Sequence, residues 1–217
     1  STTLYEGTAA TQAITNGINL SSDGGMVWTK NRDGTDEPTI MDTVTGTGFY
    51  GNTNSNNQYG GTSNAYITAF NTNGYTLGVA NQLNRSGNSF VSWTWKKAAN
   101  FFDVVSYTGN GTNNRAISHS LGEEPGMIIV KRISSNGNWG VYHRGIGNSL
   151  GLRLDSTGVA GAMSINNETI NSSSFGVSTG GYALDNNNGD DYIAYLFGHN
   201  SSTVHCGTYT NSSSGVE

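Results

Sequence analysis

Apolar and polar residues alternate in short runs along this chain, and Gly- and Asn-rich segments separate the runs. The segments 65–70 and 89–95 have the period of two that places successive side chains on opposite faces of a strand. In the second of them, Trp93 and Trp95 fall on one face, which we expect to be buried. No run has a convincing helical period, and short strands with regular turns are typical of a β-sandwich or barrel.

Two of these runs are versions of each other. The segment 25–32 reads GMVWTKNR, and the segment 126–132, which begins 101 positions later, reads GMIIVKR. Three further pairs of segments match in the same order and at nearly the same spacing: 5–7 with 107–109, 74–77 with 174–177, and 90–95 with 192–197. We infer an internal duplication with a unit of about 100 residues, the usual size of a small β-sandwich domain.

The duplication predicts two tandem antiparallel β-sandwich units of jelly-roll type, at residues 1–98 and 99–200. Residues 201–217 are then the start of a third unit or an exchanged strand, because the segment 206–211 resembles 104–109. An exchanged strand would pair with the open sheet edge of a neighbouring molecule, and we assign Tyr209 to it. The alternative is a disordered tail that contains Tyr-Thr by chance.

The composition supports an all-β chain with many turns. Hydrophobic residues are 34% and charged residues 12% of the total, both low for a globular protein, and 31 residues are Gly, which tolerates the positive φ of tight turns. The net charge of −5 offers no basic surface, so we expect no nucleic-acid partner. The single Cys, Cys206, excludes an intrachain disulfide, and no apolar run is long enough for membrane insertion.

The polar segment 185–191 is the strongest candidate for a metal site. Its Asp and Asn side chains supply the oxygen ligands that calcium prefers. It lacks the ligand pattern of an EF-hand loop, and the corresponding segment 81–89 has no carboxylate. We therefore interpret it as a solvated turn and predict no metal and no cofactor, while calcium binding at 185–191 stays open.

Candidate catalytic residues are present but form no convincing constellation. His119, His143 and Asp155 with a Ser could be assembled into a triad. The first unit has no His, whereas a duplicated catalytic fold should carry its acid–base group twice. Carboxylate pairs for glycoside hydrolysis, such as Glu123 with Asp155, occur in any acidic β protein. We predict no enzymatic activity and no catalytic residue.

Aromatic side chains beside Asn- and Gly-rich loops are better candidates for ligand contact. The segment 51–61 is almost wholly polar and is expected to form a long exposed loop. Flat rings beside Asn and Asp side chains can hold a sugar. The candidate contacts for a glycan or host surface are Tyr50, Tyr59, Tyr66, Trp139, Tyr142 and Tyr182. The alternative is that these rings attach loops to the core.

Ordered motifs in both halves carry a family resemblance. They are the segments 27–33, 41–46, 68–78 and 90–96 in the first half, and 107–111, 119–122, 125–132, 139–143 and 192–197 in the second. Through them, nearly the whole chain resembles the repeat module of tail-fibre-like and other virion structural proteins of marine bacteriophages, including cyanophages. The Asn-rich segment 52–64 departs from that pattern, so the resemblance implies no host-contacting loop there.

The resemblance implies a non-enzymatic structural and adhesive component of a virion appendage, such as a tail fibre, that builds a spike and presents loops to a host surface. The expected partners are other copies of the chain, other virion proteins and a host surface glycan, and the expected location is the virion. One alternative is a glycan-binding, lectin-like module, for which saturable glycan binding would be the evidence. The less favoured alternative is a polysaccharide-cleaving enzyme, which would release reducing ends.

Overall fold

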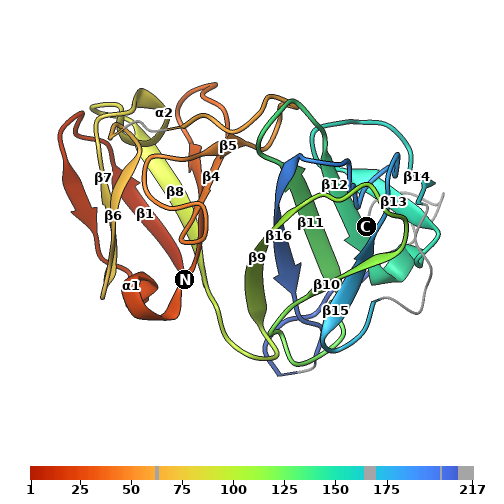
Figure 1. Cartoon of the computed structure of the whole chain (residues 1–217). Coiled ribbons are helices and arrows are strands. Elements are labelled where there is room, and N and C mark those ends of the chain that lie inside the picture. Colours follow the sequence, from red (N-terminus) through yellow and green to blue (C-terminus); the bar gives the residue numbers. More distant parts are fainter. Residues whose placement is uncertain (62–63, 164–169, 201, 210–217) are drawn as a thin grey trace, which may run out of the picture.

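The structure is a computed structural model that describes residues 1–61, 64–163, 170–200 and 202–209 (Figure 1). It consists almost entirely of antiparallel strands, which confirms the predicted all-β class. In the described part of the chain the strands form four sheets. For description, we call the part with β1 to β8 the first half and the part with β9 to β16 the second half.

In the first half, a larger sheet has the strand order β1-β8-β3-β4-β5 and a smaller one the order β2-β7-β6. The strands are β1 (Thr2–Glu6), β2 (Gln12–Ile14), β3 (Gly25–Asn31), β4 (Thr39–Asp42), β5 (Gly51–Asn52), β6 (Ile67–Asn71), β7 (Gly74–Leu77) and β8 (Ser89–Lys96). Two one-turn helices, α1 (Leu20–Asp23) and α2 (Asn81–Asn84), precede β3 and β8.

In the second half, the larger sheet has the order β14-β13-β12-β11-β16-β9, and β10 pairs with β15. The strands are β9 (Phe102–Thr108), β10 (Arg115–Ser118), β11 (Met127–Arg132), β12 (Trp139–His143), β13 (Leu150–Arg153), β14 (Gly161–Ala162), β15 (Ser174–Val177) and β16 (Asp191–Phe197). A short 3-10 helix, η1 (Arg144–Ile146), follows β12.

The two larger sheets have corresponding strand orders. The order β1-β8-β3-β4-β5 matches β9-β16-β11-β12-β13, and the pair β2-β7 matches β10-β15. Loop hydrogen bonds repeat as well: Gly7 N–H donates to Asn88 O at 2.8 Å, and 102 positions later Gly109 N–H donates to Asp190 O at 2.7 Å. These correspondences support a duplication, and the boundaries of the two units stay a prediction.

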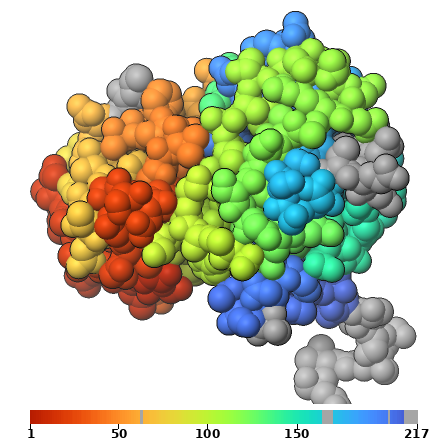
Figure 2. Space-filling model, turned by 60° about the horizontal axis from the view of Figure 1, so that its bottom comes forward, coloured from red at the N-terminus to blue at the C-terminus, as the bar shows by residue number. Residues whose placement is uncertain are grey.

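The sheets stack so that the two larger ones face each other in the middle of the molecule (Figure 1). Side chains of a central strand therefore alternate between two cores: Val27 points into the core of the first half, and Met26 into the cluster between the halves. The buried residues of this middle cluster are Met26, Ile40, Tyr59, Phe102, Val104, Ile129, Trp139, Val141, Ile193, Tyr195 and Phe197. Both halves contribute to it, and the space-filling view shows them in contact along a broad boundary (Figure 2).

After β16, the described part of the C-terminal segment stays against the second half, where Cys206 packs on the middle cluster. Residues 202–209 contain no strand, and the Tyr209 side chain is 93% exposed. The rest of the predicted third unit or exchanged strand, residues 210–217, lies outside the described residues, so the assignment of Tyr209 to assembly stays a prediction. Among the described residues, no helix is long and apolar enough to cross a membrane.

Candidate functional site

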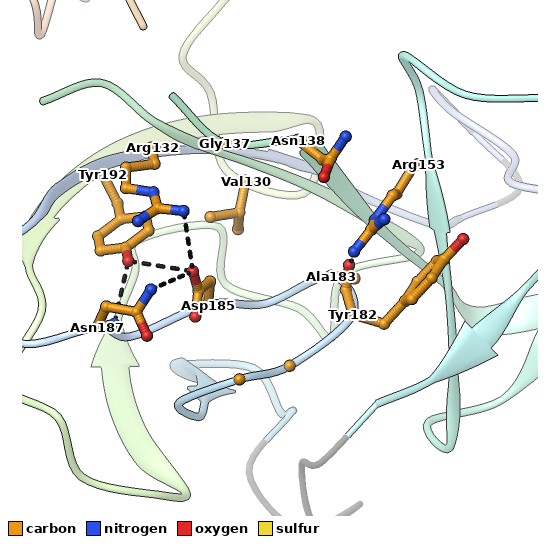
Figure 3. A pocket seen from close by; sticks show the side chains of 12 residues that line it. Val130, Arg132, Gly137, Asn138, Arg153, Tyr182, Ala183, Asp185, Asn187 and Tyr192 are labelled. Carbon is orange, nitrogen blue, oxygen red and sulfur yellow. Dashed lines mark hydrogen bonds and ion pairs between the residues drawn. The ribbon is translucent and has the colours of Figure 1, made fainter. Parts of the chain in front are cut away.

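A polar pocket of about 200 Å³ lies in the second half (Figure 3). The ends of β11 and β13, the start of β16 and the loops around them form its walls. The side chains most important for its chemistry are Arg132, Arg153, Tyr182, Asp185, Asn187 and Tyr192. They form two groups on opposite sides of the pocket, with Val130 between them (Figure 3).

Arg132, the last residue of β11, organises one side. Its Nη1 donates to Asp190 Oδ2 at 2.9 Å, and its Nη2 lies 3.9 Å from Asp185 Oδ2. The same Asp185 oxygen accepts hydrogen bonds from Asn187 Nδ2 at 3.0 Å and from Tyr192 OH at 3.3 Å. In the segment 185–191, the candidate for calcium binding, the Arg132 guanidinium therefore pairs with the carboxylates of Asp185 and Asp190, which calcium would need as ligands. Within the described ranges, no group of three or more His, Cys, Asp or Glu side chains could hold a metal ion.

Arg153 and Tyr182 form the other side. The guanidinium carbon of Arg153 lies 4.0 Å from the centre of the Tyr182 ring, and its Nε donates to Tyr182 O at 3.4 Å. The ring also packs against the backbone of β14, since a Cβ on Gly161 would come within 2.3 Å of it. Tyr182 OH donates to Val159 O at 3.1 Å. The stacked pair is a flat cationic surface whose position is fixed by the ring beneath it.

The polar groups and the flat surface of this arrangement suit the binding of a polar ligand. Guanidinium and amide groups donate hydrogen bonds, the Asp185 carboxylate accepts them, and the Arg153–Tyr182 pair offers a flat surface. Such convergent polar groups in a hollow define orientation and specificity for a small ligand. A saccharide, with its ring of hydroxyl groups, fits this mixture of donors, acceptors and flat surface.

Of the six predicted aromatic contacts, only Tyr182 lines this pocket. Tyr59, Trp139 and Tyr142 are buried in the clusters of the interior, so their rings have no surface to offer a ligand. Tyr50 and Tyr66 stack on each other with ring centroids 3.6 Å apart. The structure therefore does not bring the six residues together in one site.

The Asn-rich loop 51–61 was expected to be exposed; it is exposed only in part, because it is attached to the second half. Trp139 Nε1 donates to Asn52 O at 2.9 Å and to Ser55 O at 3.1 Å. Gly137 N–H donates to Asn56 O at 2.8 Å. The physical reason is that the backbone carbonyls of this polar segment accept hydrogen bonds from the other half instead of from water.

The histidine candidates lie apart from each other and from Asp155. His119 Nε2 lies 3.1 Å from Asn171 O, and burial lowers the pKa of its imidazole. His143 Nδ1 accepts from Gly145 N–H at 3.1 Å. Asp155 accepts from Trp139 N–H at 3.1 Å. The three side chains thus take part in different local contacts, and no hydrogen bond of a triad joins them.

One motif escapes the sequence analysis above. Residues 147–151 read Gly-Asn-Ser-Leu-Gly, the pattern of a nucleophile elbow. An elbow places its Ser on a turn from a strand into a helix, but here Ser149 lies between η1 and β13, and a strand follows it. The pattern therefore lacks the backbone context that would activate Ser149.

Sequence reasoning also missed Arg132, Arg153 and Asp185 as members of one site. Arg132 and Arg153 come from β11 and β13, which lie close because both pair with β12. The sequence signals for the site were the aromatic Tyr182 and the polar segment 185–191, which supplies Asp185 and Asn187.

The fold and the pocket define an all-β protein of stacked antiparallel sheets with a polar surface site. The chain belongs to the family described as "Domain of unknown function (DUF7483)", whose model matches residues 1–216. Neither a curated protein nor a solved structure matches the chain.

Proposed function

We propose that this chain is a non-enzymatic structural and adhesive module of a virion appendage, such as a tail fibre, which presents a surface to a host. The observation that carries the proposal is the way in which the two halves are joined. An appendage has to transmit force and keep its contact surface in a fixed orientation, and a stiff joint between its units serves both needs.

A buried polar chain crosses the boundary between the halves. Tyr195 OH, on β16, donates to Asp42 Oδ2 at 2.8 Å and lies 2.6 Å from Tyr59 OH. Asp42 also accepts from the backbone N–H groups of Val44 and Thr45 at 2.9 and 2.8 Å. Burial raises the pKa of Asp42, against the hydrogen bonds that favour its charged form. Separating the halves would break these contacts and expose the surrounding apolar residues to water, which costs free energy.

A buried ammonium group makes a second link. Lys131 has no exposed surface, and its Nζ donates to Asn56 O at 3.2 Å and to Gly137 O. Asn56 belongs to the first half, and Gly137 and Lys131 to the second. The Lys131 ammonium also lies 5.7 Å from the centre of the Trp139 ring. Together with the apolar cluster, these contacts support a single stiff body.

The stiffness can be tested by calorimetry of the whole chain. We expect one thermal transition, because the halves share a core and buried polar contacts. Two separate transitions would contradict the stiff joint. The placement in a virion is tested by immunoelectron microscopy: antibodies against the purified chain should label the appendages of intact particles, and label confined to capsids or absent from particles would contradict it.

A lectin-like module is the second candidate, and the pocket of Figure 3 is the observation that favours it. A glycan array with the purified chain should then give saturable binding that Arg153→Ala abolishes. Arg85→Ala is the matched control, because Arg85 pairs with Asp36 on the surface of the first half. Absence of binding to any glycan, or equal loss in both variants, would contradict this candidate.

A further inference from the structure

Three tryptophans line an apolar hollow on the larger sheet of the first half. Trp28, Trp93 and Trp95 surround a space of about 280 Å³. Trp93 stands directly opposite Trp28 in the sheet register, so their side chains share a face. The ring centroids of Trp28 lie 6.4 Å from those of Trp93 and of Trp95, at interplanar angles of 69° and 42°.

The apolar surface continues from the hollow to the edge strand β1. Leu4 stands opposite Val91 in the register, on the same face as Trp93, and its side chain is 64% exposed. We call Leu4, Trp28, Val91, Trp93 and Trp95 the tryptophan face. The sequence pattern predicts that Trp93 and Trp95 are buried, whereas the structure leaves both partly exposed, because the residues that it describes do not fully cover this part of the sheet.

The tryptophan face is continuous with the interface between the halves. Met26 and Ile40 lie on the same sheet and are buried in the middle cluster. Trp95 contacts Phe197 of the second half edge-on, with ring centroids 6.0 Å apart. One part of this sheet face is thus covered by the second half, while the part toward β1 is not.

The corresponding face of the second half shows what such a surface does when a neighbour is present. Ile129, Tyr195 and Phe197 stand at the positions that match Trp28, Trp93 and Trp95, and all three are buried against the first half. Uncovered apolar surface of this kind marks an interaction site in soluble proteins.

We propose that the tryptophan face is a dimerisation surface on which the same face of a second copy of this chain docks about a twofold axis. A twofold contact uses one patch on both subunits and is the commonest symmetry of oligomers. A small sugar fits less well, because tryptophan rings alone line the hollow, whereas sugar sites include positioned polar groups. The length of the apolar strip, from Trp95 to Leu4, also suits an extended protein surface. The inference stands apart from the polar pocket.

Sedimentation velocity of the full chain, from micromolar to submillimolar concentration, tests the proposal. The wild type should form a dimer in a concentration-dependent way, with a blue shift of tryptophan fluorescence. Trp93→Ser should raise the dimer Kd at least about tenfold, as expected for a central aromatic residue of an interface. Val159→Ser is the control, because Val159 is 87% exposed in the second half, and it should leave the Kd unchanged.

Leu4→Ser, on the exposed edge strand, provides a second variant should Trp93→Ser fail to fold. It should also weaken the dimer. A wild type that stays monomeric over the whole range overturns the proposal, and so does a dimer that survives substitution of both residues. Quenching of tryptophan fluorescence by a saccharide in a monomeric wild type would assign the face to a sugar instead.

Discussion

Tyr195→Phe is the sharpest test of the joint between the halves. The substitution removes one oxygen atom that donates to Asp42 Oδ2 at 2.8 Å and lies 2.6 Å from Tyr59 OH. All three side chains are buried, so water cannot replace the lost contacts. The Phe ring fills the same space, so no large cavity forms and the change isolates the hydrogen bonds.

The magnitude follows from the charge and burial of the partners. A hydrogen bond to a charged group contributes about 1.5–3 kcal/mol, and a buried hydroxyl left without a partner costs about 1–3 kcal/mol. The raised pKa of Asp42 means that its charged form is already disfavoured, so we expect the sum of these two free-energy terms to lie at the lower end of their ranges. We expect the free energy of unfolding to fall by about 2–4 kcal/mol.

Urea denaturation, followed by tryptophan fluorescence and far-ultraviolet circular dichroism, measures this loss. The midpoint should fall and the slope of the transition should stay unchanged, because the folded state keeps its compactness. Tyr182→Phe is the control: its hydroxyl donates to Val159 O at the surface, and its removal should change the stability by less than about 0.5 kcal/mol. An equal effect of the two substitutions would refute the reasoning.

Three further predictions concern the same framework. Burial lowers the pKa of Lys131 to about 8, so between pH 8 and 10 the unfolded chain, with an ordinary lysine near 10.5, binds more protons than the folded one. Lys131 should therefore contribute a rise of about 2 kcal/mol to the free energy of unfolding across this window, which urea titrations measure as the difference between the wild type and Lys131→Met, because the buried tyrosines contribute equally to both. Gly51→Ala should cost about 1–3 kcal/mol in thermal unfolding, because its Cβ would lie 2.2 Å from the Tyr59 ring. Asn84→Ala should cost about 2–4 kcal/mol, because its buried amide bonds the main chain of residues 8, 10 and 78, while the exposed Asn81→Ala should cost much less.

The pattern of apolar residues was enough to predict the all-β class and the central strands β3, β8, β11 and β16. These strands are buried on both faces or on one, and burial is what a hydrophobic period records. The period shows which side chains share a face, but not whether that face is covered. For this reason the pattern grouped Trp93 with Trp95 correctly, whereas the burial that it predicted for them is only partial.

The candidate site was far less predictable, because it depends on contacts between distant segments. Arg153 stacks on Tyr182, 29 positions away, and no local pattern specifies this contact. The docking of the loop 51–61 depends on backbone carbonyls, which every residue has, so its composition alone predicted an exposed loop. Trp139 could be identified as a large apolar side chain, but its indole N–H partner could not.

Residues at matching positions in the two halves can have different roles, and two lysines show this. Lys30 Nζ donates to the carbonyls of Gly34 and Asp36, at 3.1 and 3.0 Å, within its own half. Lys131, 101 positions later, binds the carbonyl of Gly137 in the same way and additionally that of Asn56 in the other half. In both halves, a lysine on a central strand donates to carbonyls of the loop that follows the strand. In the second half, the same lysine also links the two halves.

The sheet faces at the boundary between the halves also carry different residues at matching positions, whereas the interiors carry similar ones. The buried side-chain amides of Asn84 and Asn186, 102 positions apart, donate to the backbone carbonyls of equivalent loops in the two halves. This interior contact is therefore the same in both halves. Trp93 and Tyr195 occupy matching positions, yet one lies partly exposed and the other joins the buried chain with Asp42. The matching interior residues are sufficient to form the same fold in both halves. The residues that differ on the facing surfaces therefore determine how the two halves contact each other and, by our proposal, how two copies of the chain dimerise.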